Sequence, residues 1–428
     1  MMQNSKMDNL RITSKEKLTF MIMMGIGLLS MILSYFMDAD EHHVRFWSNF
    51  LHEALFFTGI GVMALFFLSV SITALAGWVT VFKRVWEAFA LFLSVGFVLM
   101  LILSVALYFD WHHLYHWADA SEVAKDKVLT GKSSFLNKGW YIIGGLVIVG
   151  IWYLASYKIR QYSLQEDADA PDEDFSHHRK MRVWAAFSLP FIGFSSAAAI
   201  WLWLMSVDAH WYSTLFAWYT ASSWFIAMLC LTVLIILYLK GKGYFANFNN
   251  DHLHDLGKYI FGISIFWTYL WFSQFMLIWY ANIGEETVYF RERIDSYPVL
   301  FYGNLIINFI LPFFVLMRND TKRKQGSMVL VAVLLFIGHW IDVFLMVKPG
   351  VLHTAHALAS HGEAVNEMAH GMHESNFVSG FTLPGFLEFG TLIGFLGLFL
   401  YVVFRTMTKA SLTPKNDPYL QESIHHHV

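Results

Sequence analysis

Apolar residues are gathered along the chain into ten runs of 19 to 26 positions, with polar segments between them. The hydrocarbon core of a bilayer is about 30 Å thick and takes about 20 residues of helix to cross. In that core the backbone can be satisfied only within the chain, as in a helix. The pattern predicts an all-α polytopic membrane protein with transmembrane helices at Leu18–Met37, His52–Thr73, Trp86–Phe109, Gly139–Tyr157, Val183–Ser206, Thr214–Leu239, Tyr259–Tyr280, Val299–Met317, Ser327–Val347 and Pro384–Phe404.

Lysine and arginine are distributed unevenly between the polar segments. With the N-terminus placed inside, the inner segments hold 21 of the 29 Lys and Arg residues and the outer segments hold eight. Cytoplasmic loops of membrane proteins carry such an excess of positive charge. The distribution therefore predicts a multi-pass inner-membrane protein with both termini in the cytoplasm.

The order of the runs suggests two four-helix bundles, helices two to five and six to nine, flanked by helices one and ten. Helices five and nine each carry an aspartate and a histidine toward the outer end, which favours a parallel repeat. The acidic stretch 166–174 is expected to be a solvated linker. The predicted units are a cytoplasmic N-terminus 1–17, the first helix and an outer loop 18–51, bundles 52–206 and 207–347, a periplasmic His- and Glu-rich loop 348–383, the last helix 384–404 and a cytoplasmic tail 405–428.

The composition excludes several classes of protein. Charged residues make up only 14% of the chain and hydrophobic residues 57%, whereas soluble domains carry about 25% charged residues. A net charge of −3 provides no bulk attraction to nucleic acid. The single cysteine, Cys230, rules out an internal disulfide, a CxxCH haem attachment and a cysteine-bound iron–sulfur cluster.

His339 and Asp342 are the strongest candidates for chemistry. An ionisable group deep in a bilayer costs roughly 2.5–3.5 kcal/mol on insertion scales, so its presence needs a reason. The two residues are three positions apart in one predicted helix and therefore share a face. Asp342 could accept a hydrogen bond from the imidazole and form a proton relay. A structural pair between helices is the alternative.

Four further candidates fall near predicted helix ends. Asp208 and His210 lie where helix five meets a short outer loop, so proton transfer competes with a simple exposed helix end. Glu53 and Glu388 fall in the first turns of helices two and ten, where the helix dipole stabilises a carboxylate. Capping and proton transfer are both open for these two.

Uncharged polar groups inside helices seven and eight either fasten helices together or hold a chain of waters for protons. They are Tyr269, Ser273, Gln274, Asn304 and Asn308. Glu87 begins helix three beside Lys83 and Arg84, where a surface ion pair competes with a site of proton entry.

Neither metal nor haem is expected on this chain. His339 is the one histidine well inside a predicted helix, so the facing histidine pairs of a membrane cytochrome b are not expected. The outer loop is rich in His and Glu, but their spacing matches no zinc pattern, which favours a solvated or partner-facing loop. The residues in question are His353, His356, His361, Glu363, Glu367, His370, His373 and Glu374.

Four strings stand out together: SVDAHWYS at 206–213, FSQFMLIWY at 272–280, GHWID at 338–342 and NDPYL at 416–420. The chain thereby resembles the smaller NrfD-like membrane subunit (ActF type) of bacterial alternative complex III, which is related to the membrane subunit of polysulfide reductase. The resemblance runs from the first helix to the C-terminus.

The resemblance implies a subunit of a respiratory quinol:cytochrome c oxidoreductase that has no redox centre of its own. It implies partners that carry haem c and iron–sulfur clusters: multihaem and monohaem cytochromes, an iron–sulfur protein and a second NrfD-like membrane subunit, in lipid and with a terminal oxidase as a further candidate. The chain would contribute proton conduction, quinol interaction or both. The hypothesis for a quinol site names Asp208, His210, Trp211 and His339.

Two other functions stay open on the sequence. The first is a proton-coupled secondary transporter that uses His339 and Asp342. Pro190 and Pro312 interrupt predicted helices five and eight, and broken helices are typical of transporter substrate sites. The second is a purely structural membrane anchor.

Overall fold

The computed structural model describes residues 9–37, 43–168, 175–362 and 382–427. Over these ranges the chain is helical without β-strands, and ten spans are long and apolar enough to cross a membrane, which confirms the predicted fold class. The spans are α1 (Ser14–Met37), α2 (Val44–Thr73), α3 (Lys83–Leu91) with α4 (Leu93–Tyr108), the π-helix η3 (Trp140–Gly144) with α7 (Gly145–Ala168), α8 (Ser176–Trp203), α9 (Leu215–Gly241), α10 (Asn250–Ala281), α12 (Pro298–Leu305) with the π-helix η5 (Ile306–Ile310) and α13 (Leu311–Leu316), α15 (Gln325–Gly362), and α17 (Phe386–Met407).

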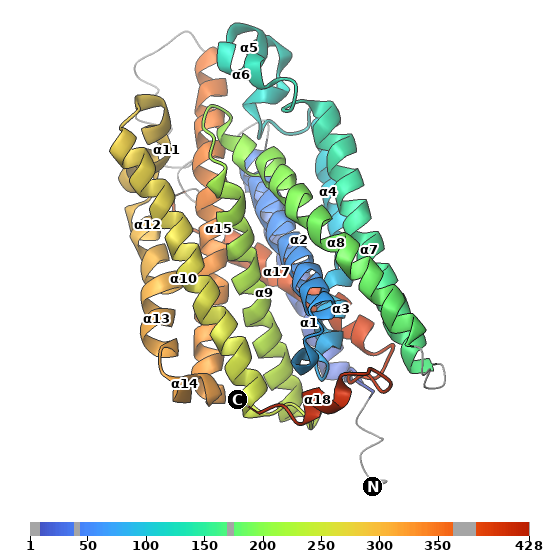
Figure 1. Cartoon of the computed structure of the whole chain (residues 1–428). Coiled ribbons are helices and arrows are strands. Elements are labelled where there is room, and N and C mark those ends of the chain that lie inside the picture. The colour runs from blue at the N-terminus through green and yellow to red at the C-terminus, as the bar shows by residue number, and fades with distance from the viewer. Residues whose placement is uncertain (1–8, 38–42, 169–174, 363–381, 428) are drawn as a thin grey trace.

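Shorter helices gather at the two ends of these spans (Figure 1). One end, here called the α5 end, holds η2 (His116–Ala118), α5 (Ala120–Lys125), α6 (Lys127–Lys132), η4 (Met205–Asp208) and α11 (Gly284–Ser296). The opposite end, here called the α18 end, holds η1 (Gly77–Val79), α14 (Asn319–Arg323) and α18 (Leu420–Ile424). An isolated antiparallel bridge joins Asn9 to Ser411 at the α18 end, where the first and last described residues lie.

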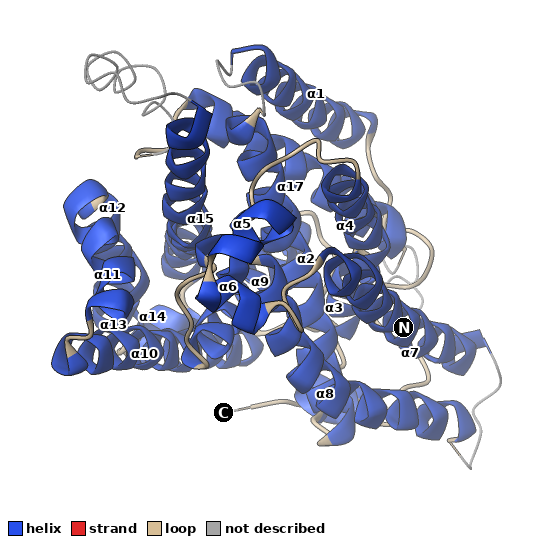
Figure 2. Ribbon diagram, turned by 90° about the horizontal axis from the view of Figure 1, so that it is seen from above, coloured by secondary structure: helices blue, strands red, loops and turns tan. Residues whose placement is uncertain are grey.

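Two four-helix bundles lie side by side, as Figure 2 shows in a view along the helices. In the first, α2, α4, α7 and α8 pack around one another, and α3 continues the line of α4. In the second, α9 and α10 pack with α15 and with the segment from α12 to α13. α2 contacts both α9 and α15 and so joins the bundles, while α1 and α17 form a flanking pair against α2 and α3.

Several predicted helix boundaries are wrong: α7 continues past Tyr157 to Ala168, α8 begins at Ser176 rather than at Val183, and α10 begins at Asn250 rather than at Tyr259. Two further boundaries are wrong at places where polar groups are buried. α2 begins at Val44 rather than at His52, and α15 continues past Val347 to Gly362. Charged and polar residues interrupt the apolar pattern at both places, but they pair with each other inside the protein. The fully buried ammonium of Lys348 donates to Ser48 Oγ at 2.6 Å and to Asn49 Oδ1 at 2.5 Å.

The π-helix η5 has a cause in the sequence. Pro312 has no backbone N–H, so the carbonyl of Asn308 loses the partner that a regular α-helix would give it. Such a loss commonly loosens the helix into a wider turn or a kink. The π-helix ends two residues before Pro312 and contains Asn308 itself.

α1 and α17 approach each other closely because glycines face each other across their interface. A Cβ atom added at Gly27 would lie 2.3 Å from the Cα of Gly394. Small residues at such crossings allow the backbones of membrane helices to touch, where lipid offers no hydrophobic drive for association. Gly25 on the same helix has no such neighbour within 4 Å.

We predict that Gly27→Ala destabilises the α1–α17 pair by about 1–3 kcal/mol, because one added methyl group meets backbone that cannot give way. Gly25→Ala is the matched control, and its higher helix propensity leaves stability unchanged or slightly increased. Thermal unfolding of the detergent-solubilised chain measures both. Equal melting temperatures for the two variants would contradict the close contact.

Candidate functional site

Asp342 is the centre of a buried hydrogen-bond network in the second bundle. Its carboxylate is fully buried and accepts from Asn304 Nδ2 at 2.7 Å, Trp267 Nε1 at 2.9 Å and the hydroxyl of Tyr219. The donors come from α12, α10 and α9, so the carboxylate holds three helices against α15. Burial of a carboxylate without hydrogen-bond donors would destabilise the fold by several kcal/mol. The three donors around Asp342 provide the hydrogen bonds that its oxygens need.

His339 lies beside this network and meets a hydroxyl of α9. Its Nδ1 lies 2.9 Å from Ser223 Oγ, and Ser223 lies near Asp342 as well. His339 does not form the expected direct hydrogen bond to Asp342, and Ser223 is the polar residue that lies near both. The imidazole is fully buried, and its Nε2 has no hydrogen-bond partner.

Asn304 and Asn308 extend the network toward the α18 end. Asn308 Nδ2 donates to Asn304 Oδ1 at 2.6 Å, and both amides are buried. Asn308 Oδ1 is unpartnered and lies against Gly338, where an added Cβ would approach it to 2.2 Å. A glycine is therefore required for α15 to approach η5 at this position.

A small cavity adjoins Asp342 on its α5 side. It offers about 20 Å³ to the centre of a water molecule, which is room for about one water. Its polar lining groups join the buried network to α11. They are Tyr219, Gln274, Tyr289, Arg293, Asn304 and Asp342.

Arg293 closes this cavity at the α5 end and was not predicted from the sequence. Its guanidinium is buried, pairs with Asp208 at 3.0 Å and donates to the backbone carbonyl of Leu345 at 3.0 Å. It also lies 3.4 Å above the centre of the Tyr289 ring, in cation–π geometry. Trp211 stacks on the other face of the Tyr289 ring, with 3.9 Å between the two ring centres.

Several predicted residues lie outside this network. His210 is half exposed and meets Asp126 of the α5–α6 region at 2.5 Å, so it is separated from Asp208 and from His339. Tyr269 is 62% exposed on the outside of α10, whereas Gln274 is buried beside the cavity. The four residues of the quinol hypothesis therefore do not form one site: His339 is buried, and His210 is at the surface.

Glu53 lies deep in the protein rather than in a first helical turn. Because α2 begins at Val44, Glu53 is in the third turn, where it cannot cap the helix. Trp340 Nε1 donates to its Oε1 at 2.7 Å, while its buried Oε2 has no partner. The neighbouring His52 is equally buried and meets the carbonyl of Trp340 at 3.0 Å, so His339 is not the one deep histidine.

Glu388 caps the start of α17, which is one of the two roles predicted for it. Its carboxylate accepts from the backbone N–H of Gly385 at 2.9 Å at the start of α17. It also binds Arg45 through two contacts of 2.8 and 3.0 Å and Asn49 at 3.1 Å. Together with Lys348, these residues tie α2, α15 and α17 together near the α5 end.

Glu87 forms an ion pair, but a buried one rather than the expected surface pair. Arg160 donates to its carboxylate at 2.5 Å, Ser163 at 2.7 Å, and Arg84 lies 3.7 Å away. All four are buried at the α18 end of the first bundle. Such a saturated carboxylate is well suited to join α3 to α7.

The acidic stretch 166–174 is not a solvated linker at its start. Glu166 and Asp167 belong to the last turn of α7, where Glu166 is buried and Asp167 binds Arg84 at 2.5 Å. Asp167 also accepts from the backbone N–H of Lys415 at 2.8 Å, which holds the C-terminal segment. Positions 169–174 lie outside the described residues.

The His- and Glu-rich outer loop is described only in part. Positions 353–362, with His353, His356 and His361, continue α15 as helix. The remaining residues, Glu363, Glu367, His370, His373 and Glu374, lie outside the described residues.

Comparison with known proteins adds no relative to this picture. No protein-family model matches the chain, and no curated protein matches it significantly.

Glu292, beside Arg293 on α11, carries a carboxyl whose pKa is shifted toward neutral pH. Burial raises the pKa of the Glu292 carboxyl to about 7, although Arg293 opposes the shift, and Asp208 adds to it. The folded state therefore holds the proton to higher pH than the unfolded state, whose carboxyl has a pKa of 4.5. Folding stability contributed by this group is present at low pH and is lost as pH rises through about 7.

We predict that Glu292→Gln flattens the fall in melting temperature between about pH 5 and pH 8, because glutamine keeps the neutral form at every pH. Glu285→Gln, an exposed position on the same helix, is the control and leaves the slope unchanged. Thermal scans of the solubilised chain at several pH values measure the slope. A slope that Glu292→Gln does not alter would contradict the shifted pKa.

Proposed function

We propose that this chain conducts protons across a bacterial inner membrane as the NrfD-like subunit of a respiratory quinol:cytochrome c oxidoreductase similar to alternative complex III. The observation that carries the proposal is the network of His339, Ser223 and Asp342, fully buried in the second bundle. Ionisable groups at such depth are costly and are typical of proton relays.

The cavity size favours protons over quinol as the species that reaches Asp342. Ligand pockets for drug-sized molecules measure about 300–1,000 Å³, whereas this cavity holds about one water. A water molecule between Arg293 and Asp342 continues the hydrogen-bond chain, but a quinol ring does not fit there. Quinol oxidation then belongs to the second NrfD-like subunit beside its iron–sulfur partner.

Unpartnered polar atoms mark where water completes the route. His339 Nε2 and Asn308 Oδ1 are such atoms in the second bundle, and Glu53 Oε2 is one near the junction of the bundles. Buried polar atoms without protein partners are usually satisfied by ordered water. The proposed route enters at the α5 end past Arg293, reaches Asp342 and continues through Ser223 to His339.

The charge distribution supports an orientation with the α5 end on the periplasmic side and the α18 end on the cytoplasmic side. In this orientation the end of the cavity that Arg293 closes faces the periplasmic side, where haem- and iron–sulfur-bearing partners of the proposed complex would dock. Electrons stay on those partners, because the single cysteine gives this chain no means to hold a cysteine-bound cluster.

A proton-coupled secondary transporter is the second candidate. The observation in its favour is the π-helix η5, which contains Asn308 and interrupts a membrane-spanning helix beside the buried network. Irregular helices at mid-membrane are typical of transporter substrate sites. The same cavity argument weighs against it, because a substrate larger than water needs more room than the cavity offers.

Native purification separates the candidates. We expect the chain to co-purify with haem c-bearing and iron–sulfur-bearing subunits in a complex that oxidises quinol with cytochrome c as acceptor. An optical spectrum and identification of the co-purifying chains provide the measurement. A colourless assembly of this chain alone would reject the oxidoreductase and favour the transporter.

We predict that His339→Ala and Asp342→Asn each lower proton-coupled quinol turnover by at least about tenfold, because positioned acid–base groups contribute about 10²–10⁴-fold. The double variant should be little worse than the worse single variant, because groups that act as a unit are not additive. Turnover and proton release are measured on the intact purified complex.

Asp320→Asn is the control for this series, since it removes an exposed carboxylate at the α18 end of the same bundle. Haem content shows first that each variant assembles. Normal assembly with unchanged turnover and proton stoichiometry in both single variants would return the pair to a structural role.

A further inference from the structure

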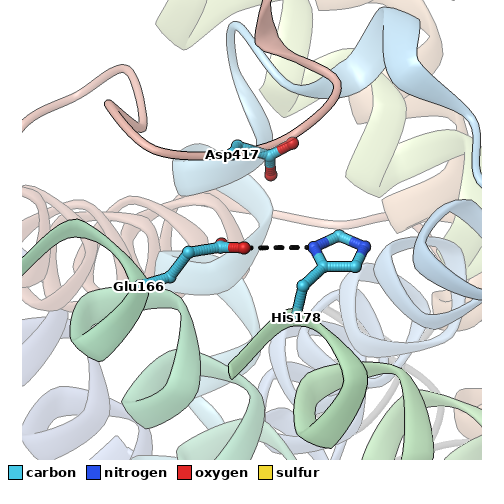
Figure 3. A group of neighbouring side chains, drawn as sticks. All are labelled: Glu166, His178 and Asp417. Carbon is cyan, nitrogen blue, oxygen red and sulfur yellow. Dashed lines mark ion pairs between the residues drawn. The ribbon is translucent and has the colours of Figure 1, made fainter. Parts of the chain in front are cut away.

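Glu166, His178 and Asp417 converge at the α18 end of the first bundle. Glu166 lies in the last turn of α7, His178 in the first turn of α8, and Asp417 in the segment that follows α17. One ligand atom from each residue lies within 4.8 Å of the other two. Figure 3 shows the imidazole and the Glu166 carboxylate facing each other, with the Asp417 carboxylate beside them.

Two of these side chains are buried without hydrogen bonds. Glu166 and His178 are each 8% exposed, and neither the carboxylate oxygens of Glu166 nor the ring nitrogens of His178 have a hydrogen-bond partner. Their closest approach is 3.2 Å between His178 Nδ1 and Glu166 Oε1, without the angles of a hydrogen bond. Buried polar groups in this condition point to water or an ion between them.

With His178 neutral, the surrounding charges are out of balance by one. Three cations and four carboxylates are joined here by ion pairs, and all but Asp167 are buried. An uncompensated buried carboxylate is strongly destabilising. The seven groups are Lys83, Arg84, Arg160, Glu87, Glu166, Asp167 and Asp417.

The donor set suits a divalent transition metal. Imidazole nitrogen and carboxylate oxygen bind zinc at about 2.0–2.2 Å, and imidazole selects this class over Mg²⁺ or Ca²⁺. Ligand atoms of a tetrahedral zinc site lie about 3.4 Å apart, so a small closing movement from the observed spread suffices. An adjacent cavity, lined by His178, Asp417 and Lys83, has room for about one water as a fourth ligand.

We propose that Glu166, His178 and Asp417 bind a divalent metal ion of the zinc class, which fastens the C-terminal segment to α7 and α8. Lys83 competes for this place, because its ammonium binds Asp417 and lies 3.9 Å from Glu166. Metal binding withdraws Asp417 from Lys83 and brings two positive charges to a cluster that lacks one when His178 is neutral. The site is independent of the proton route in the second bundle.

Zinc counting tests the site on the full-length chain purified in detergent. Both parent and variants carry His425→Gln and His427→Gln, which remove exposed tail histidines that would bind zinc by themselves. After EDTA treatment and equilibration with Zn²⁺, the parent should hold one zinc more per chain than the variant with His178→Gln. His254→Gln, a buried imidazole on α10 outside the cluster, is the matched control and keeps that zinc.

Lys83→Met provides a readout that does not depend on losing a ligand. Removal of the competing ammonium should raise the affinity for Zn²⁺ about tenfold or more, and Zn²⁺ should raise the melting temperature of this variant by mass action. A cluster that is only an ion-pair network predicts a destabilised variant that Zn²⁺ does not rescue. Equal zinc content in the parent and in His178→Gln, or no zinc in the parent, would overturn the proposal.

Discussion

The bilayer interior contains no water, so a polar group inside the spans needs a partner from the protein or from water enclosed within it. This constraint decides where the helices of this chain meet. Asp342 binds donors from three helices, and Glu87 and Glu388 each collect cations and hydroxyl or amide groups from neighbouring spans. The apolar surfaces could slide past one another at little cost, whereas these polar contacts fix one arrangement. The most enclosed span, α2, therefore carries Asn49 and Glu53 as well as its apolar face.

The ten spans could be predicted because length and hydropathy are local properties of the sequence. The ends of α2 and α15 could not, since Lys348 interrupts the apolar run and yet is buried by partners 300 residues away in the chain. A run of apolar residues indicates a helix in lipid, but it does not indicate where a charged side chain is buried because another helix supplies its partners. The same reason explains Glu53, whose predicted capping role depended on a helix start that Lys348 and its partners move.

The candidate site, too, could be predicted from the sequence only in part. His339 with Asp342, and Asn304 with Asn308, were predictable because three- and four-residue spacings place side chains on one helix face. The partners across helices were not: Trp267 binds Asp342 from α10, whereas Tyr269, two positions further on, faces outward. Sequence favours neither of these aromatic residues without knowledge of the helix rotation. The same reason made it impossible to predict the cluster of Glu166, His178 and Asp417 from the sequence, since Asp417 comes from a segment far along the chain.

The hydrogen bonds around Asp342 suggest how a proton is accommodated if the proposed conduction holds. An ionised carboxylate can only accept, and its three donors suit that state. A proton on the oxygen facing Asn304 needs an acceptor there, which the amide supplies by exchanging its NH₂ and C=O ends. Asn304 would then donate to Asn308, whose own amide can turn its unpartnered oxygen toward it. The two asparagines thus form a pair whose direction reverses with the charge on Asp342, and Asn308 lies in the π-helix η5, a type of irregularity that is frequent at functional sites.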